Sequence, residues 1–560
     1  MSAMYPFLLS TLLALNSTGG PLVALDYGVF EGATDGNLST FLGVPFSQPA
    51  ARFELPEVPT LLHGVQNATA FGAACPQQAT DMPIPLPISY TAVSEDCLTL
   101  NVFTPSFAVP QLTGFESEHF SEGSQIEAPE SKLPVFVWFY GGGFEIGASA
   151  DSVVGPVVER SILTDQPVII VTPNYRVSAF GFLAGAEAAD AGITNLGLRD
   201  QIFALEWVQT HIAAFGGDPE RVVIGGPSAG AISAALLLLD NKRFDQRALF
   251  RGAFMLSGAP PNTGTVAEGQ SDYDGLVAAN NCTESADTLE CLKQVPFDDF
   301  MATVNHTTNL FSYSSANNIW RPRVDGDVVV HHPLVSVTRG LYAKIPIVIG
   351  TSDDEGTLFS LINTNITTND EFVNYIHTNY LPRSTSEQIA NISVLYPDDP
   401  AQGSPFDTGS ANEYTPQFKR LSAFQGDYIF IGARRLFLES AAATQPAWSW
   451  VNKLRKSTPI MGSAHCGDLR LWFAGDESLN DTFAVDSMIN FINTLDPNHS
   501  LRRTNASAVF WPTWDTPSEN GSTSLLTLSD SGVDIVPEDF RVDAIRVLFE
   551  LLLEAAEKSG

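Results

Sequence analysis

The feature that most constrains the fold is a passage from an apolar strand-like run, through a serine between small residues, into a second apolar run. Residues 221–232 read RVVIGGPSAGAI, and residues 231–239 continue as AISAALLLL. The first run is typical of a strand buried on both faces, and the second of a buried helix. A G-x-S-x-G match alone is weak evidence, because long chains contain it by chance. Ser228 is therefore either a nucleophile on a tight turn or a small residue in a glycine-rich loop.

Similar apolar runs recur along the chain and alternate with helical patterns. Residues 198–215 have apolar side chains at helical spacing and end at a glycine pair, which predicts a helix with a glycine C-cap. This alternation predicts an α/β fold with one large, mostly parallel sheet and helices on both faces. Active sites of such sheets lie beyond the carboxyl ends of the strands, where Ser228 would stand. The runs that predict strands are 134–140, 166–175, 221–226, 345–350 and 447–454.

A serine nucleophile needs a histidine base, and a carboxylate must orient that base. In α/β hydrolases the chain order is serine, acid, histidine. His465 fits, because it follows the last of these predicted strands in GSAHCGDLRLWF; the alternative is a structural histidine. The histidines set aside, because they precede Ser228 or lie in sequons, in a polar helical stretch or ahead of any strand-end acid, are His63, His119, His211, His306, His331, His332, His377 and His499.

Two further groups complete the candidate site. The run 345–350 leads into Asp353, Asp354 and Glu355, and the residues alone do not show which carboxylate would orient His465. The triplet Gly141–Gly143 follows the run 134–140, so its backbone N–H groups, with that of Ala229, could bind an oxyanion. The alternative for the triplet is a flexible loop.

Charge and composition exclude several classes of partner. The 560-residue chain has 63 acidic and 29 basic residues, a net charge of −34, which repels nucleic acid and anionic membrane surfaces. We interpret this charge as one that keeps the protein soluble in an acidic external medium, rather than as one that steers a ligand.

A length-based estimate would give about three or four domains. Metal binding is not expected, because no C-x-x-C or H-x-x-x-H pair occurs.

The N-terminus indicates export. The apolar segment Tyr5–Leu15 precedes small polar residues, so residues 1–17 are predicted to be a signal peptide, although they contain no lysine or arginine. No later apolar run reaches the roughly 18 residues that span a bilayer, so no stable membrane insertion is expected. Sequons predict a secreted, glycosylated surface. They begin at Asn37, Asn67, Asn281, Asn305, Asn365, Asn391, Asn480, Asn498, Asn505 and Asn520.

The five cysteines favour two short-range disulfides in an exported chain. Their spacing pairs Cys75 with Cys97 and Cys282 with Cys291, and leaves Cys466 unpaired.

With these residues identified, the chain resembles the type-B carboxylesterase/lipase family, the cholinesterase-like α/β hydrolases, and in particular its secreted fungal members. The resemblance runs from about Gly28 to the end of the chain. It implies that residues 18–560 form one α/β-hydrolase domain, which hydrolyses carboxylic esters through an acyl-enzyme without metal or organic cofactor. The motifs that carry it include FLGVPFSQP, SEDCLTLNVFTP, YGGGFEIG, NYRVSAFGFL, RPRVDGDVV, DEGTLF and AHCGDL.

The resemblance assigns roles that the residues alone left open. It selects Glu355 as the acid, with Ser228 as nucleophile and His465 as base. It supports both disulfides. The amides that it assigns to the oxyanion hole are those of Gly142, Gly143 and Ala229.

The same resemblance implies a structural role for two residues, and at two other positions this sequence departs from the family's pattern. Arg52 and Glu95 stand where the family has a structural ion pair, so neither is expected to be catalytic. Pro227 stands where the family usually has glutamate, which removes a negative charge near the site. Cys466 stands where many members have glycine or alanine, and we expect it to be a small buried filler.

The loop between Cys75 and Cys97 bears on the substrate. Pro83, Pro85 and Pro87 would break any helix there, whereas lipases of the family have a longer helical flap. We therefore expect an esterase with an open gorge that acts on small-molecule or lipid esters, as a monomer or weak homodimer. The alternatives are a lipase or steryl esterase with a lid and, more distantly, a non-catalytic binding protein.

Overall fold

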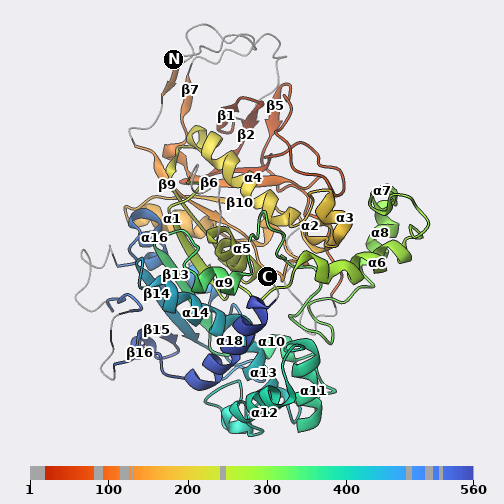
Figure 1. Ribbon diagram of the computed structural model, residues 1–560. Helices are drawn as coiled ribbons and strands as arrows, with labels where there is room; N and C mark the ends of the chain where they lie inside the picture. The colour runs from red at the N-terminus through yellow and green to blue at the C-terminus, as the bar shows by residue number, and fades with distance from the viewer. Residues whose placement is uncertain are drawn as a thin grey trace.

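An eleven-stranded sheet runs through the middle of the molecule (Figure 1). From β15 to β10 every neighbouring pair of strands is parallel, and antiparallel strands complete both edges. This confirms the predicted α/β fold with a mostly parallel sheet. The strands, in spatial order, are β16 (Gly532–Pro537), β15 (Ser524–Ser529), β14 (Ala447–Lys453), β13 (Ile347–Ser352), β12 (Gly252–Leu256), β11 (Gly217–Pro227), β9 (Leu133–Trp138), β10 (Ile169–Pro173), β6 (Thr99–Pro105), β4 (Leu38–Pro45) and β3 (Ala33–Asp35).

The computed structural model describes residues 19–80, 92–113, 125–127, 131–239, 248–473, 482–498, 509–515, 517 and 521–558. The expected signal peptide lies outside the described residues, as do residues 81–91 with the three alternating prolines. Two small sheets flank the large one near the N-terminal part of the chain. They comprise β1 (Leu22–Leu25), β2 (Gly28–Glu31) and β5 (Val65–Asn67), and the hairpin β7 (Gln111–Thr113) with β8 (Gln125–Glu127).

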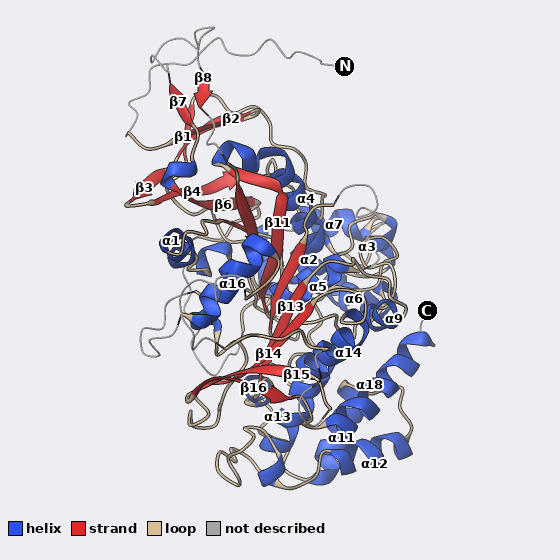
Figure 2. Ribbon diagram, turned by 90° about the vertical axis from the view of Figure 1, so that its left-hand side faces the viewer, coloured by secondary structure: helices blue, strands red, loops and turns tan. Residues whose placement is uncertain are grey.

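The central strands are apolar along their whole length because both faces of the sheet are covered. In β9, Val135 and Val137 pack into one hydrophobic cluster, whereas Phe136 and Trp138 pack into another. This alternation is the two-residue period of a strand, with both sides buried. Figure 2 shows α1 (Gly155–Leu163) and α16 (Phe483–Thr494) on one side of the sheet. On the other side lie α5 (Ala229–Leu238), α9 (Pro333–Thr338) and α14 (Gly432–Ala441).

The helix predicted over residues 198–215 is α4 (Leu196–His211), extended by a 3₁₀ turn that ends at Gly216. Gly216 has a φ of 87°, the left-handed conformation expected of a glycine C-cap. The other helices are α2 (Ser178–Phe182), α3 (Ala186–Asp190), α6 (Gln270–Ala279), α7 (Thr288–Gln294), α8 (Phe297–Val304), α10 (Thr357–Ser360), α11 (Asn369–Asn379), α12 (Ser386–Leu395), α13 (Phe418–Gly426), α15 (Leu469–Trp472) and α18 (Val542–Glu557).

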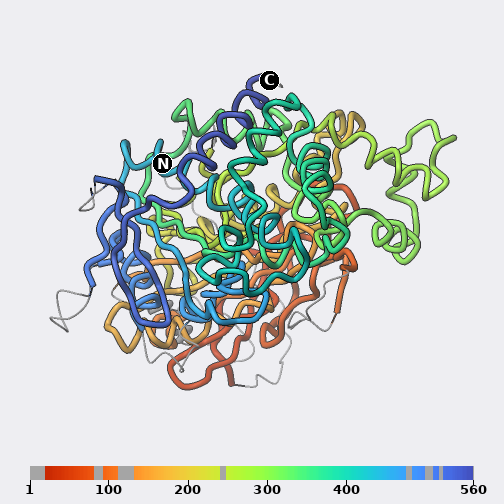
Figure 3. Tube along the Cα trace, turned by 90° about the horizontal axis from the view of Figure 1, so that it is seen from below, coloured from red at the N-terminus to blue at the C-terminus, as the bar shows by residue number. Residues whose placement is uncertain are grey.

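Both predicted disulfides are confirmed. Cys75 is bonded to Cys97, Cys282 is bonded to Cys291, and Cys466 is a free thiol. The Cys282–Cys291 bond closes a short loop between α6 and α7. These two helices and α8 project from the side of the molecule, as Figure 3 shows in lime green.

The structure shows which sequon asparagines are exposed and whether any helix could cross a membrane. Asn498 is buried, and its side-chain amide is hydrogen-bonded to the backbone C=O and N–H of Trp511 at 2.9 and 2.8 Å, so the acceptor nitrogen of this sequon is not accessible in the folded chain. None of the helices in the described part of the chain is long and apolar enough to cross a bilayer. Three sequon asparagines, Asn480, Asn505 and Asn520, lie outside the described residues; of the others, those that are exposed are Asn37, Asn67, Asn281, Asn305, Asn365 and Asn391.

Candidate active site

Ser228 occupies the turn between β11 and α5. Its φ is 54° and its ψ is −123°, a backbone conformation that costs a non-glycine residue about 1–3 kcal/mol. Its neighbours must be small, because a Cβ added at Gly226 or Gly230 would lie 2.2 or 2.1 Å from the Phe139 carbonyl oxygen. The G-x-S-x-G spacing thus records how closely this turn approaches the residue that follows β9.

Pro227 is the last residue of β11 and pairs in parallel register with Leu256 of β12. An extended, fixed φ suits this position. The backbone N–H of Ser228 donates to the Leu256 carbonyl at 2.8 Å, so the sheet ladder holds the turn as far as the serine itself.

The glycine triplet is a turn rather than an open loop. Gly142 and Gly143 have φ values of 109° and 63°, and the Gly142 carbonyl accepts from the backbone N–H groups of Glu145 and Ile146 at 3.1 Å each. The side-chain amide of Asn318 donates to the Gly143 carbonyl. Left-handed backbone of this kind favours glycine, which explains the residue type at both positions.

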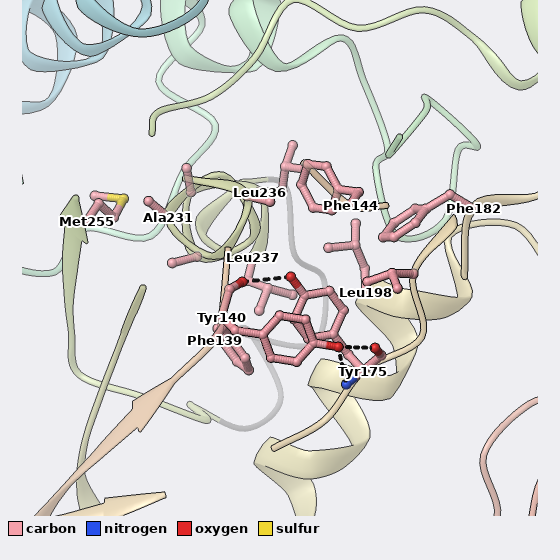
Figure 4. Packing of buried hydrophobic residues seen from close by; sticks show 14 of the residues in the cluster. Phe139, Tyr140, Phe144, Tyr175, Phe182, Leu198, Ala231, Leu236, Leu237 and Met255 are labelled. Carbon is pink, nitrogen blue, oxygen red and sulfur yellow. Dashed lines mark hydrogen bonds between the residues drawn. The ribbon is translucent and has the colours of Figure 1, made fainter. Parts of the chain in front are cut away.

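Two tyrosines hold the start of this turn to the end of β10. The rings of Tyr140 and Tyr175 are stacked, with centroids 4.1 Å apart. The Tyr175 hydroxyl donates to the Tyr140 carbonyl at 2.7 Å, and the Tyr140 hydroxyl donates to the Tyr175 carbonyl (Figure 4). Burial raises the pKa of both phenols, so both remain neutral donors.

Glu145 is a component of the site that the sequence reasoning missed. Its side chain is fully buried, and its Oε2 accepts from the Leu310 backbone N–H at 2.6 Å. Burial raises the pKa of this carboxyl to about 8, although the Leu310 N–H opposes the rise. Glu145 thereby joins the glycine turn to the segment that contains Leu310, which lines the other side of the cavity described below.

The three consecutive carboxylates after β13 have three different surroundings. Asp353 and Asp354 both contact the Lys456 ammonium group, and Asp354 also accepts from Ser404 Oγ at 2.9 Å. Glu355 contacts Nδ1 of His465 through Oε2, and its Oε1 accepts from the Ser352 N–H at 2.6 Å. Of the three, Glu355 is the carboxylate that meets the histidine.

Aromatic rings fix the plane of the His465 imidazole. Phe359 and Phe430 lie 5.1 and 4.5 Å from it between ring centroids. Burial lowers the pKa of His465, but the adjacent Cys466 sulfur and the Glu355 carboxylate outweigh burial and raise it overall. Nε2 of His465 is buried and has no hydrogen-bond partner within the described part of the chain.

All the candidate groups except the buried acid open onto one cavity of about 860 Å³. Ser228 and His465 line it, as do Gly142, Gly143 and Ala229. Much of the remaining wall is apolar. It includes Leu310, Phe311, Leu358, Phe359, Ile429 and Phe430.

Comparison with known proteins agrees with this architecture. Residues 19–534 match the model of the carboxylesterase family. The chain belongs to this family. It is therefore an enzyme of the carboxylesterase type, a serine hydrolase.

Several members of the family are similar over most of their length. "Secreted lipase 1" of Botryotinia fuckeliana is 37% identical, over 91% of this chain and 89% of the relative. "Secreted triacylglycerol lipase LIP1" of Gibberella zeae is 35% identical, over 93% and 89%. The crystal structure of Aspergillus niger EstA superposes with a TM-score of 0.79 at 27% identity, over 95% of this chain and 98% of that one.

Two expectations about this carboxylesterase are decided by the structure. Arg52 and Glu95 form a bidentate ion pair at 2.8 and 3.0 Å, and neither lines the cavity, which confirms a structural pair. The prediction that Cys466 is a buried filler is wrong. Cys466 is partly exposed, has a φ of 55° and lines the cavity beside His465, because the chain turns at this residue after the histidine.

Proposed function

We propose that this carboxylesterase hydrolyses hydrophobic carboxylic esters through an acyl-enzyme, with Ser228 as nucleophile, His465 as base and Glu355 as the acid that orients it. The observation that carries the proposal is the contact between Glu355 and Nδ1 of His465 in a cavity shared with a strained serine. The other ring nitrogen of His465 has no hydrogen-bond partner among the residues that the structure describes. A serine in this backbone conformation persists only where the surrounding structure holds it.

The proposed reaction assigns a defined role to each of these groups. His465 takes the proton of the Ser228 hydroxyl as its oxygen attacks the ester carbonyl, and Glu355 stabilises the imidazolium that forms. Backbone N–H groups of Gly142, Gly143 and Ala229 would stabilise the oxyanion, each by a few kcal/mol. His465 then returns the proton to the departing alcohol. A water that loses its proton to His465 attacks the acyl-enzyme, and His465 returns that proton to the Ser228 oxygen as the acid departs.

The substrate class follows from the cavity wall. Phe359 and Phe430 present aromatic surface next to His465, and Phe311 stacks on Phe359 in the same wall, so we propose apolar acyl or alcohol groups as the parts bound there. Two relatives are named as secreted proteins, which supports export of this chain. We further propose that residues 18–560 act as one hydrolase unit, as monomer or weak homodimer, since the central sheet takes strands from Ala33 to Pro537.

The test is Ser228→Ala assayed on p-nitrophenyl butyrate. We expect kcat to fall at least about 1,000-fold, because the residues of a triad act as a unit. Ser257→Ala is the matched control, since Ser257 also follows a central strand with a φ of 52° but does not line the cavity. It should retain activity within about 3-fold. Turnover by Ser228→Ala at the wild-type rate would refute the proposal.

Glu355→Gln gives a second test of the same assignment. It preserves shape but removes the charge that stabilises the imidazolium, so kcat should fall by about 10⁴-fold. A fluorophosphonate that labels the wild-type protein at Ser228, and not Ser228→Ala, would show that the serine is activated.

Triacylglycerol hydrolysis is a second candidate, because two relatives are named as lipases, one of them as a triacylglycerol lipase. Rates measured on tributyrin below and above its solubility limit separate the two. A sharp rise above the limit would indicate a lipase, and saturation below it an esterase.

A further inference from the structure

A second cavity, of about 500 Å³, adjoins the candidate active site. Some of the residues that line the second cavity also line the first, and these shared residues form the partition between the two cavities. These are Asn262, Thr263, Asn317, Arg321 and Tyr428.

Arg321 is the charged member of this partition. Among the described residues that line the larger cavity it is the only lysine or arginine, and Asp151 is the only carboxylate. The Arg321 guanidinium donates to Asn317 Oδ1, whereas its Nε is buried without a hydrogen-bond partner in the described part of the chain. A guanidinium has five N–H donors, so this one is far from satisfied by the residues around it.

The two carboxylates whose charges act on Arg321 are already paired with other arginines. Glu268 contacts Arg383, and Asp272 lies 3.5 Å from Arg323. By contrast, the deeply buried Arg434 meets the carboxylate of Glu538. Burial lowers the pKa of Arg321, but an arginine stays protonated in proteins, so its charge remains without a carboxylate partner among the described residues.

Two polar members of the partition, Asn262 and Tyr428, are hydrogen-bonded to groups other than Arg321. His332 Nδ1 accepts from the Leu334 N–H, so Nε2 carries the ring proton and donates to Asn262 Oδ1 at 3.1 Å. The Asn262 amide donates to the Tyr428 hydroxyl at 2.7 Å, which donates to the Tyr380 carbonyl at 3.3 Å. Burial lowers the pKa of His332 to about 4, so this chain is neutral at pH 7.

We propose that Arg321 recognises a carboxylate on the substrate: the preferred esters carry a free carboxylate remote from the ester group, which binds the guanidinium while the ester reaches Ser228. A planar guanidinium suits a carboxylate because it can donate two parallel hydrogen bonds. The inference rests on the proposed ester hydrolysis and adds a specificity-determining residue to it.

The test compares paired substrates of equal length. One series consists of p-nitrophenyl half-esters of succinic, glutaric, adipic and suberic acids, and the other of the neutral p-nitrophenyl alkanoates. Acetyl esters of ω-hydroxy acids place the carboxylate on the alcohol instead, so the series together show on which side of the ester it lies. For each chain length we compare kcat/KM for the charged substrate with kcat/KM for the neutral one and use the ratio of the two.

Arg321→Met should lower that ratio at least about 10-fold for the best-fitting length, through KM rather than kcat, because the carboxylate is bound equally before and during reaction. Arg321→Lys should retain part of the ratio. Arg339→Met is the control, since Arg339 is exposed and lines only the second cavity, and it should leave the ratio unchanged. Equal effects of Arg321→Met on both series, or an unchanged ratio, would overturn the inference.

Failure of the proposed ester hydrolysis can be distinguished from failure of carboxylate recognition by Arg321. If the wild-type protein hydrolyses neither series, the proposed reaction is wrong, and the binding claim is then decided by calorimetry with adipate and glutarate on the Ser228→Ala protein. Binding that Arg321→Met weakens at least about 10-fold supports recognition of the carboxylate. Absence of binding overturns it, whatever the activity.

Discussion

Replacing Glu145 by glutamine should change how the stability of this enzyme depends on pH. Glu145 is fully buried beneath the glycine turn, with a pKa of about 8 because burial disfavours its carboxylate. Glutamine has nearly the same shape, stays neutral at every pH and keeps an oxygen that can accept from the Leu310 N–H. The variant therefore removes the ionisation and little else.

The sign and size follow from proton linkage. In the unfolded chain the glutamate titrates at its ordinary pKa of 4.5, so between pH 4.5 and 8 the folded chain holds a proton that the unfolded chain has released. The free energy of unfolding of the wild-type protein therefore falls as the pH rises through this window. At about 1.36 kcal/mol per pH unit, the loss is at most about 5 kcal/mol at pH 8 and above, and it is absent below pH 4.5.

Denaturant unfolding between pH 4.5 and 9 at constant ionic strength measures this difference. Glu145→Gln should match the wild-type protein at pH 4.5 and exceed its free energy of unfolding by about 2–5 kcal/mol at pH 9. Glu159→Gln is the control for loss of one negative charge, because Glu159 is exposed on α1. A difference between Glu145→Gln and the wild-type protein that does not vary with pH, or that Glu159→Gln reproduces, would refute the reasoning.

Two other changes should affect stability by different routes. Replacing Cys75 and Cys97 by serine removes the disulfide between them, which spans a sequence separation of 22, and should lower the free energy of unfolding by about 3 kcal/mol. Cys466→Ser should leave the free energy of unfolding unchanged, because Cys466 is a free thiol. Denaturation with and without reductant checks both expectations. Burial would raise the pKa of Glu538, but its two arginine partners lower it to about 2, so its contribution is present above pH 4.5 and is lost as the pH falls towards 2. Glu538→Gln should therefore cost about 3–5 kcal/mol at pH 7 and less at pH 3, and an equal cost at both values would contradict this account.

Much of the sheet and the turn at Ser228 could be predicted because the signals are local. A parallel strand covered on both faces is a continuous apolar run, and β9, β10, β11, β13 and β14 all have one. The turn at Ser228 requires small residues on either side, which the sequence displays directly. The position of His465 followed from chain order.

What the sequence left open depends on contacts between distant segments. Asp353, Asp354 and Glu355 are chemically alike and adjacent, and only the fold shows that Lys456 takes two of them while His465 takes the third. β12 (GAFML) is a short apolar run that the sequence reasoning did not single out as a strand. Short strands of this kind cannot be told from other apolar runs by periodicity.

The same limit applies to the charges around the cavity. Arg321 and Arg323 stand two residues apart in RPRVDGD, and the sequence treats them alike. The partner of Arg323 is Asp272, 51 residues away in the chain, so which arginine is neutralised emerges only from the folded structure. The burial that leaves Glu145 protonated is likewise invisible in YGGGFEIG, where a glutamate suggests a solvated turn.

Pro227 and Arg321 shift the charge of the cavity in the same direction by different means. A glutamate before Ser228, which the family resemblance leads us to expect, would place a negative charge at the end of β11 and repel an anionic substrate. Proline removes that charge, and it also keeps the extended geometry on which the strained turn at Ser228 depends. Arg321 adds an unneutralised positive charge to the wall of the same cavity. Both differences make the wall of this cavity less negative than it would be with a glutamate at position 227 and a neutral residue at position 321, in a chain whose net charge is −34.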